Sequence, residues 1–177
     1  MDFDLTPEQE LIRDTVRTFA RERVGPVAEE LDLTGRFPYE LVAELGELGL
    51  LGLPIPEQYG GAGGDTVSYA IAVEELTRID SSVAITVAAH TSLGTMPILL
   101  YGTEEQKQHW LPALAAGRRL AAFGLTEAGA GSDAGASRTT AELRDGSWLV
   151  NGSKLFITNA GTDITWGVTL TARTGDD

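Results

Sequence analysis

The sequence changes character near residue 118, and this change limits what the chain can fold into. Before it, apolar residues recur at helical spacing between helix-start signals. After it, short apolar runs alternate with Asp145-Gly146 and Asn151-Gly152, which are residue pairs typical of hairpin turns. The sequence therefore predicts an α+β chain, with an all-helical bundle over residues 1–118 and an incomplete antiparallel β domain over residues 119–177.

Helix-start signals divide the first part of the chain. Thr6-Pro7-Glu8-Gln9 and Thr103-Glu104-Glu105-Gln106 each place a threonine three residues before a glutamine, which is the pattern of a capping box. Gly25-Pro26 predicts a break or kink in the first helix. Phe37-Pro38 is expected to open a second helix that Gly49 ends, and Asp65 or Thr66 is expected to cap a third.

Residues 81–94 carry no charged side chain and are apolar on nearly all sides, which predicts a helix at the centre of the bundle. His90 in this segment is expected to be a hydrogen-bonded core group or to line a pocket, whereas His109 is expected at the surface. The apolar run Leu50–Pro56 is interrupted by glycine and proline, which predicts a buried extended connection. Strands are expected at residues 148–150, 154–158 and 165–172.

Composition excludes several classes of function. The net charge of −13 argues against nucleic-acid binding and against a membrane-surface protein that relies on basic residues. The absence of cysteine rules out disulfides, thiolate zinc sites and iron–sulfur clusters, and no metal site is expected. The start Met1-Asp2-Phe3-Asp4 does not resemble a signal peptide, and no apolar run reaches the length of a membrane span. We therefore expect a cytoplasmic protein without a membrane span.

Residues Phe123–Asp133 form the first candidate site, a glycine-lined, hydroxyl-bearing turn after an apolar stretch. Such a turn can hold a flat or phosphorylated ligand, but composition alone favours a turn that only changes the direction of the chain, because a lone glycine loop is weak evidence. Gly129, Gly131 and Ala134 imitate a dinucleotide-binding fingerprint, which requires a strand and then a helix in a parallel unit, a context not predicted here. Ser132 is not in a nucleophile elbow, which argues against a hydrolase.

Phe156 and Thr158 form the second candidate site. Residues two apart on a strand share a face, so this aromatic ring and hydroxyl could stack on and hydrogen-bond to a flat heterocycle. The competing interpretation is a half-buried strand that carries a surface threonine, and the two residues alone favour this interpretation.

Four segments in order give the chain a family resemblance. Together they resemble the N-terminal half of an acyl-CoA dehydrogenase, and the similarity runs from about residue 3 to residue 173. The segments are Leu-Gly-Leu-Leu-Gly-Leu-Pro-Ile-Pro-Glu-Gln-Tyr-Gly-Gly (48–61), Tyr-Gly-Thr-Glu-Glu-Gln-Lys (101–107), Leu-Thr-Glu-Ala-Gly-Ala-Gly-Ser-Asp (125–133) and Asn-Gly-Ser-Lys-Leu-Phe-Ile-Thr-Asn (151–159).

The resemblance implies FAD as cofactor and an acyl-CoA thioester as substrate. The matching positions within residues 123–126 line the isoalloxazine and its ribityl side. Residues 131–132 match a turn against the flavin, and residues 156–158 match a strand behind the ring. In the family the Thr158 position brings a hydroxyl near flavin N5. The turn that Gly131 and Ser132 match also contacts the pantetheine or pyrophosphate region of the CoA thioester. The matching residues are Phe123, Leu125, Thr126, Gly131, Ser132, Phe156, Ile157 and Thr158.

Three departures from the family pattern qualify the resemblance. Ala128 stands where the family usually has proline, and Phe156 stands where many members have tryptophan. The family's catalytic base is a glutamate in a second helical domain, which is absent from this chain, so no catalytic residue is assigned. Glu127 is instead expected to fix the turn, and Glu74-Glu75 to form a solvated helix face.

The implied reaction is α,β-dehydrogenation of an acyl-CoA, an oxidation of a CH–CH group. A carboxylate takes the α-proton, the flavin accepts the β-hydride, and an electron-transfer flavoprotein reoxidises the flavin. The family also implies a homo-oligomer, either a dimer or a tetramer. Alternatives are an acyl-CoA oxidase or monooxygenase of the same fold, a truncated non-catalytic fragment, and a plain helical interaction domain that leaves the motifs after residue 120 unexplained.

Overall fold

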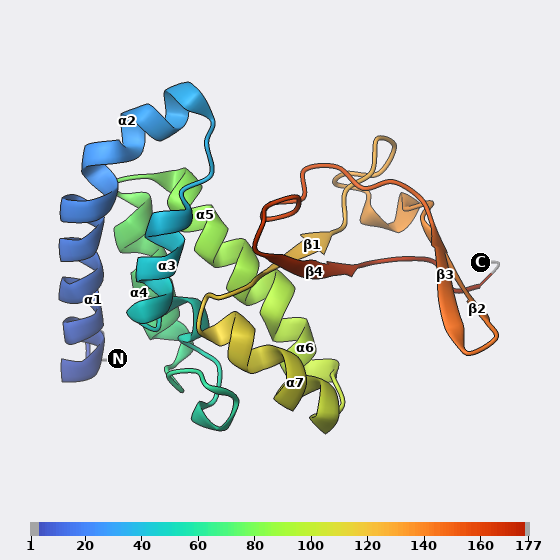
Figure 1. The fold of residues 1–177 in the computed structure, drawn as a ribbon, viewed down its shortest axis with the longest axis horizontal. Coiled ribbons are helices and arrows are strands. Elements are labelled where there is room, and N and C mark those ends of the chain that lie inside the picture. The colour runs from blue at the N-terminus through green and yellow to red at the C-terminus, as the bar shows by residue number, and fades with distance from the viewer. Residues whose placement is uncertain (1–3, 176–177) are drawn as a thin grey trace.

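The computed structural model describes residues 4–175 and places a helical bundle beside a small β region (Figure 1). The expectation that no signal peptide is present falls partly on residues 1–3, which lie outside the described residues. The helices are α1 Pro7–Phe19, α2 Gly25–Thr34, α3 Tyr39–Glu47, α4 Thr66–Thr77, α5 Ser81–Ala88, α6 Met96–Tyr101 and α7 Glu104–Ala115. The strands are β1 Leu120–Gly124, β2 Thr140–Arg144, β3 Ser147–Asn151 and β4 Thr165–Leu170.

The predicted helix starts are confirmed by side-chain caps. In α1 the Gln9 amide donates to Thr6 Oγ1 at 3.2 Å while the Gln9 side chain accepts from the Thr6 amide at 3.0 Å, and α7 repeats this box with Thr103 and Gln106. Asp65 caps α4 by accepting from the Ser68 amide at 2.6 Å. Asp65 also accepts from the Gln9 side chain at 2.8 Å, so two local caps join α1 to α4.

Gly25-Pro26 produces a kink and not a break. A π-helical turn over Ala20–Val24 carries the chain from α1 directly into α2 (Figure 1). The wide turn accommodates a proline at the second position of α2, because proline lacks the N–H group that a continuous helix needs.

The connection after α3 is wound and not extended, so that prediction was wrong. Residues Leu50–Gly52 form a 3₁₀ turn, and Gly49 starts it with a φ of 73°. A Cβ on Gly52 would lie 2.7 Å from the Ala115 Cβ, so glycine lets this turn press against α7. Burial of Leu51 and Ile55 favours the compact turn over an extended strand, because it places both side chains in the core.

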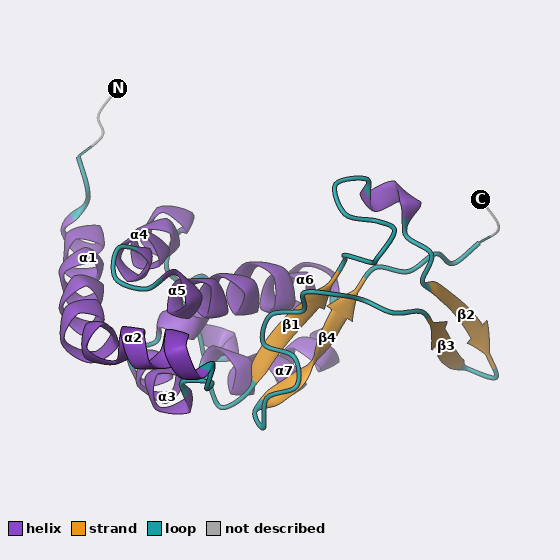
Figure 2. Ribbon diagram, turned by 90° about the horizontal axis from the view of Figure 1, so that it is seen from above, coloured by secondary structure: helices purple, strands orange, loops and turns teal. Residues whose placement is uncertain are grey.

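The helix α5 continues through a π-helical segment, Ala89–Thr95, into α6, and this rod lies against the β region (Figure 2). By length and composition alone residues Ser81–Tyr101 could cross a membrane, so the expectation that no run is long enough was wrong. However, 56% of the apolar window is buried, which is typical of the core helix of a globular protein. Ile85 and Leu93 are 51% and 45% exposed, so one face of the predicted central helix is open.

Glu74 and Glu75 have different surroundings, which corrects the expectation of a shared solvated face. The side chain of Glu74 is 61% exposed, whereas that of Glu75 is 5% exposed. Arg17 Nη2 lies 2.7 Å from Glu75 Oε1, and its hydrogen bonds lower the pKa of that carboxyl. A buried carboxylate requires such a partner, so α4 packs its charged residue toward α1.

The β region contains both kinds of strand pairing, which corrects the all-antiparallel prediction. The strands β2 and β3 form the expected antiparallel hairpin around Asp145-Gly146, whereas β1 and β4 pair in parallel. Parallel pairing needs a long crossover, and residues 125–164 between the two strands supply it. The expected strand at residues 154–158 does not form, because Phe156 and Asn159 take positive φ angles of 58° and 69°.

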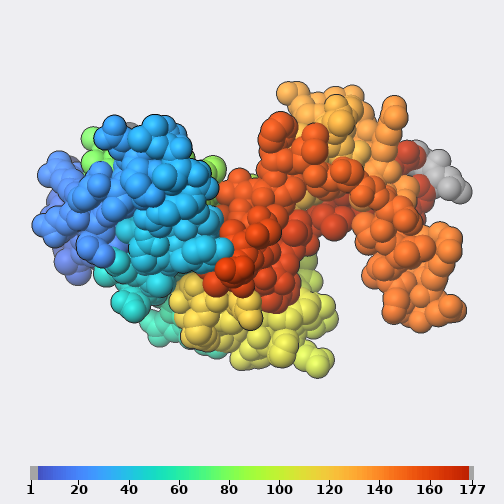
Figure 3. All heavy atoms as spheres, turned by 45° about the horizontal axis from the view of Figure 1, so that its top comes forward, coloured from blue at the N-terminus to red at the C-terminus, as the bar shows by residue number. Residues whose placement is uncertain are grey.

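The hairpin projects from the rest of the molecule (Figure 3). Several of its apolar side chains are exposed. Leu143 pairs with Trp148, and their side chains are 59% and 58% exposed. We expect the 177-residue chain to self-associate at micromolar concentration, because exposed apolar patches drive association. Sedimentation velocity measures this, and Trp148→Thr should shift the chain toward monomer. A monodisperse monomer before the substitution would contradict the prediction.

Candidate functional site

The strand β1 supports the candidate site from within the core. The Ala121 amide donates to His90 Nδ1 at 3.0 Å, and the Ala121 carbonyl accepts from the Asn159 side chain at 3.4 Å. His90 is fully buried, as expected for a core group, and burial lowers the pKa of its ring to about 4. His109 is exposed, as predicted. The strand that leads to Leu125 is therefore held by the helical rod on one side and by the turn at Asn159 on the other.

The two candidate segments lie side by side even though the second is not a strand. The Leu155 amide donates to the Thr126 carbonyl at 2.8 Å, which joins the start of the second segment to the residues just after β1. At its other end the Asn159 side chain donates to the Thr86 carbonyl at 2.9 Å as well as to Ala121. Residues 155–159 are thus fastened at both ends alongside residues 121–126, and Phe123, Leu125, Thr126, Phe156, Ile157 and Thr158 belong to one continuous region.

Several polar groups in this region have no partner within the described chain. The amide of Thr126 and the hydroxyls of Thr126, Ser132 and Thr158 make no hydrogen bond to any residue between 4 and 175. The Phe156 side chain is 89% exposed, and Leu125 and Ile157 are half-buried. An open aromatic ring beside half-buried aliphatic groups and free donors matches what a flat heteroaromatic ligand needs.

Glu127 fixes the turn, as the sequence predicted. Its Oε1 accepts from Ser137 Oγ at 2.6 Å, from the Thr139 amide at 2.9 Å and from Lys154 Nζ at 2.8 Å, and its Oε2 accepts from the Arg138 amide at 2.7 Å. These bonds, led by the one from Lys154, hold the pKa of the carboxyl well below its usual range. A carboxylate so stabilised is a weak base, so Glu127 is structural and not catalytic.

The loop that contains Gly131 and Ser132 is exposed and follows a short antiparallel bridge between Glu127 and Ala130. Neither Gly129 nor Gly131 has a positive φ, and a Cβ at either position would meet no atom within 4 Å. The open space above these glycines leaves room for a ligand to approach the backbone, and Ala128 does not disturb the bridge.

Sequence reasoning missed the residues that assemble the site. Lys154 and Asn159 lie within the fourth motif, but no local pattern shows that they reach Glu127 and Ala121. Asn159 Oδ1 is buried without a hydrogen-bond partner among the described residues. The Nδ2 group of the same side chain donates to Thr86 and Ala121 and so holds two segments together.

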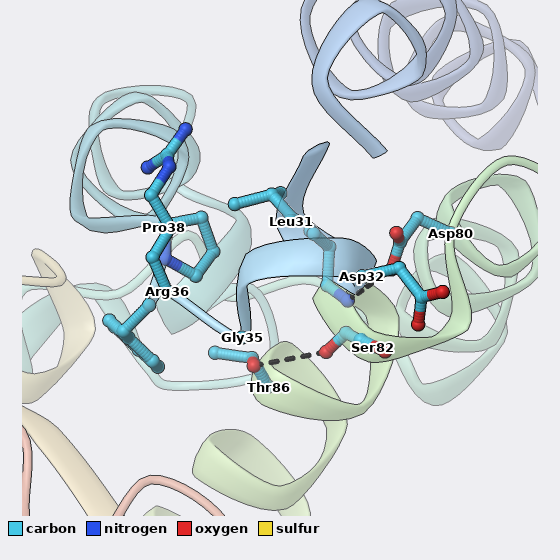
Figure 4. A pocket seen from close by; sticks show the side chains of 10 residues that line it. Leu31, Asp32, Gly35, Arg36, Pro38, Asp80, Ser82 and Thr86 are labelled. Carbon is cyan, nitrogen blue, oxygen red and sulfur yellow. Dashed lines mark hydrogen bonds between the residues drawn. The ribbon is translucent and has the colours of Figure 1, made fainter. Parts of the chain in front are cut away.

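A separate cavity lies in the helical bundle, and none of the predicted site residues lines it. Figure 4 shows its lining between the end of α2 and the start of α5, including Asp32, Arg36, Asp80 and Thr86. Its volume is about 310 Å³. Arg36 is already paired with Glu30 and Glu40, so the cavity offers no free base to an anion. No group of three metal-ligating side chains occurs among residues 4–175.

Comparison with known proteins identifies the same family that the motifs resemble. Residues 6–118 match the model of the acyl-CoA dehydrogenase N-terminal domain, and residues 122–177 match the middle-domain model. The chain is 51% identical to an acyl-CoA dehydrogenase of Bacillus subtilis (strain 168) over 95% of its own length and 45% of the relative's. It is 50% identical to a short-chain-specific acyl-CoA dehydrogenase of Clostridium acetobutylicum, over 98% of its own length and 46% of the relative's.

Comparison of the fold identifies the same family as comparison of the sequence. A glutaryl-CoA dehydrogenase from Mycobacterium smegmatis, solved in complex with FADH2, superposes with a TM-score of 0.91 at 40% identity. That match covers 97% of this chain and 44% of the solved one. The chain thus spans about half the length of the relatives it matches. With two family models matched in order and the fold shared at this identity, the chain belongs to the acyl-CoA dehydrogenase family.

Proposed function

We propose that this chain supplies the helical and middle parts, residues 1–118 and 119–177, of an FAD-dependent oxidoreductase that introduces an α,β double bond into acyl-CoA thioesters. One observation carries the proposal. The donors of Thr126 and Thr158 have no partner among the described residues, and they lie in the same region as the exposed ring of Phe156. An isoalloxazine needs apolar packing against its faces and hydrogen-bond donors at its edges, and this region offers both.

The cofactor assignment follows the eight residues that the family resemblance names. Ser132, with its exposed hydroxyl, is also assigned to the acyl-CoA. When bound, FAD supplies the two-electron oxidant for the CH–CH group. The role of this chain's residues is to bind, orient and shield the ligands. The FAD-binding residues in this proposal are Phe123, Leu125, Thr126, Gly131, Ser132, Phe156, Ile157 and Thr158.

The base that takes the α-proton is assigned to no residue of this chain. Glu127 is unsuitable, because both of its carboxylate oxygens already accept hydrogen bonds and its pKa is lowered. We infer that a carboxylate outside residues 4–175 performs this step. The same proposal includes an electron-transfer flavoprotein as electron acceptor, a homo-oligomeric protein, and a cytoplasmic location.

Flavin binding and turnover test the proposal directly. The purified protein at its natural length is expected to bind FAD, and the double substitution Thr126→Val with Thr158→Val should weaken binding by about tenfold, as loss of buried donors does. Thr77→Val is the matched control, since the Thr77 hydroxyl only returns to the Val73 carbonyl of α4. Fluorescence titration measures both effects, and failure of the unsubstituted protein to bind FAD would refute the proposal.

Turnover separates the remaining alternatives. Acyl-CoA oxidation with an artificial electron acceptor and without peroxide supports the dehydrogenase. Peroxide formed in step with enoyl-CoA would instead support the oxidase. FAD binding without any turnover of acyl-CoA would support a non-catalytic chain.

A further inference from the structure

Lys154, which has no role in the proposed function, lies at the centre of a nearly buried cluster. Its Nζ lies 2.8 Å from Glu127 Oε1, 2.9 Å from Ser137 Oγ and 3.0 Å from the Leu125 carbonyl oxygen. The side chains of Lys154 and Glu127 are 10% and 9% exposed. A lysine so enclosed is rare unless its charge is paired, and here one carboxylate balances it.

The cluster connects parts of the chain that are far apart in sequence. Lys154 follows the hairpin, the Leu125 carbonyl follows β1, and Ser137 follows the exposed loop. Glu127 extends the connection, because it also accepts from the backbone amides of Arg138 and Thr139. Movement of any one of these segments therefore breaks charge-assisted hydrogen bonds to the others.

The consequence concerns the peptide group between Leu125 and Thr126. Its carbonyl accepts from the Lys154 ammonium, while its N–H, which belongs to Thr126, makes no hydrogen bond to any described residue. The next carbonyl, that of Thr126, is taken by the Leu155 amide. Both carbonyls that flank this N–H are thus anchored, so the direction of the N–H is set. A cation at one end of a peptide also makes the N–H at its other end a stronger donor.

We propose that Lys154, held in place by Glu127, is a positioning residue that orients and polarises the Thr126 N–H for an electron-rich edge of the bound cofactor. The proposal rests on FAD being the ligand of this region. Lys154 itself does not touch the ligand and acts through the Leu125–Thr126 peptide.

Three substitutions in the protein at its natural length test this role. Lys154→Met removes the charge and the donors, and Lys154→Gln keeps an N–H donor without the charge. Lys107→Met is the control, because Lys107 is the other lysine of the sequence and lies in α7, outside the cluster. Each protein is titrated with FAD, the visible spectrum of the bound flavin is recorded, and unfolding is followed with urea.

Lys154→Met is expected to weaken FAD binding about tenfold, the effect of losing one hydrogen bond, because the Thr126 N–H is no longer held toward the cofactor. It should also shift the flavin spectrum, a readout that stability alone does not move. Lys154→Gln is expected to remain folded and to show a smaller change in the same direction, so it decides the question if Lys154→Met does not fold. Lys107→Met should match the unsubstituted protein.

The outcomes distinguish this proposal from the one on which it rests. If the unsubstituted protein binds no FAD, the proposed function fails. If it binds FAD, and the folded Lys154 variants bind within twofold of it with an unchanged spectrum, the positioning role is refuted. A loss of stability in the Lys154 variants without any change in affinity or spectrum would also refute it, because the cluster would then serve only the fold.

Discussion

Acidification from pH 7 to pH 4 is expected to remove about 3 kcal/mol more unfolding free energy from this protein than from its His90→Asn variant. The reason is the lowered pKa of His90, about 4 in the folded chain against an ordinary value of 6.5. Below pH 6.5 the unfolded chain binds a proton at this ring that the folded chain excludes until about pH 4. The contribution of neutral His90 to the free energy of unfolding is therefore complete above pH 6.5 and is lost as the pH falls from 6.5 to about 4.

The hydrogen bonds of His90 explain why protonation is so unfavourable. His90 Nδ1 accepts from the Ala121 amide, so the proton of the neutral ring resides on Nε2. A second proton, on Nδ1, would point at the Ala121 N–H, so two hydrogen-bond donors would face each other. His90 has no exposed surface, so water cannot relieve this contact. Protonation therefore both buries a charge and detaches β1 from the helical rod, which carries the effect to the candidate site.

Urea unfolding at a series of pH values measures this difference. Carboxylates with lowered pKa values, such as Glu75 and Glu127, also lose their stabilising effect in acid, but subtraction of the two profiles removes their shared contribution. His109→Asn is the matched control for replacing a histidine by asparagine, because His109 is exposed. Parallel profiles for the unsubstituted protein and His90→Asn would contradict the prediction, as would an NMR titration of the His90 ring with a midpoint near 6.5.

Gly94→Val is expected to lower the free energy of unfolding by about 3 kcal/mol, near the upper end of overpacking costs. Gly94 lies in the π-helical segment, where a Cβ would come within 2.6 Å of the Ala121 Cβ and 2.7 Å of the Ala121 carbonyl carbon. These atoms belong to a buried strand, so relief requires β1 and the rod to separate. The Gly94 carbonyl also accepts from Thr169 Oγ1 at 3.3 Å, so β4 is disturbed as well.

The displaced strand carries Phe123 and leads to Thr126, so we also expect weaker FAD binding in Gly94→Val. Gly167→Val is the matched control, because a Cβ at Gly167 in β4 would meet no atom within 4 Å. Urea unfolding and FAD titration compare the two variants. Equal stability of Gly94→Val and Gly167→Val would show that the helix and strand are not in close contact.

Much of the helical part could be predicted because its signals are local. The capping boxes at Thr6 and Thr103, the cap at Asp65 and the hairpin turn at Asp145-Gly146 each involve residues within about four positions of one another. The wrong predictions concern segments whose form depends on distant partners. The winding of residues 50–52 depends on contact with Ala115, and the burial of Glu75 depends on Arg17 of another helix.

The candidate site divides in the same way. The motifs identified the segments that contain Phe123–Thr126 and Phe156–Thr158, and with them the family. They did not show that the second segment is a loop with Phe156 at a positive φ, since its alternating residues equally suit a strand.

The sequence by itself determined the capped helices, the turn residues and the ordered motifs, because each depends on neighbours along the chain. The tertiary structure alone decided the parallel pairing of β1 with β4, the buried link from His90 to Ala121, and the reach of Lys154 to Glu127. These contacts join residues far apart in sequence, and their energies come from burial and charge pairing that arise only when the segments meet. The bundle was thus predictable from local chemistry, whereas the shape of the candidate site was not.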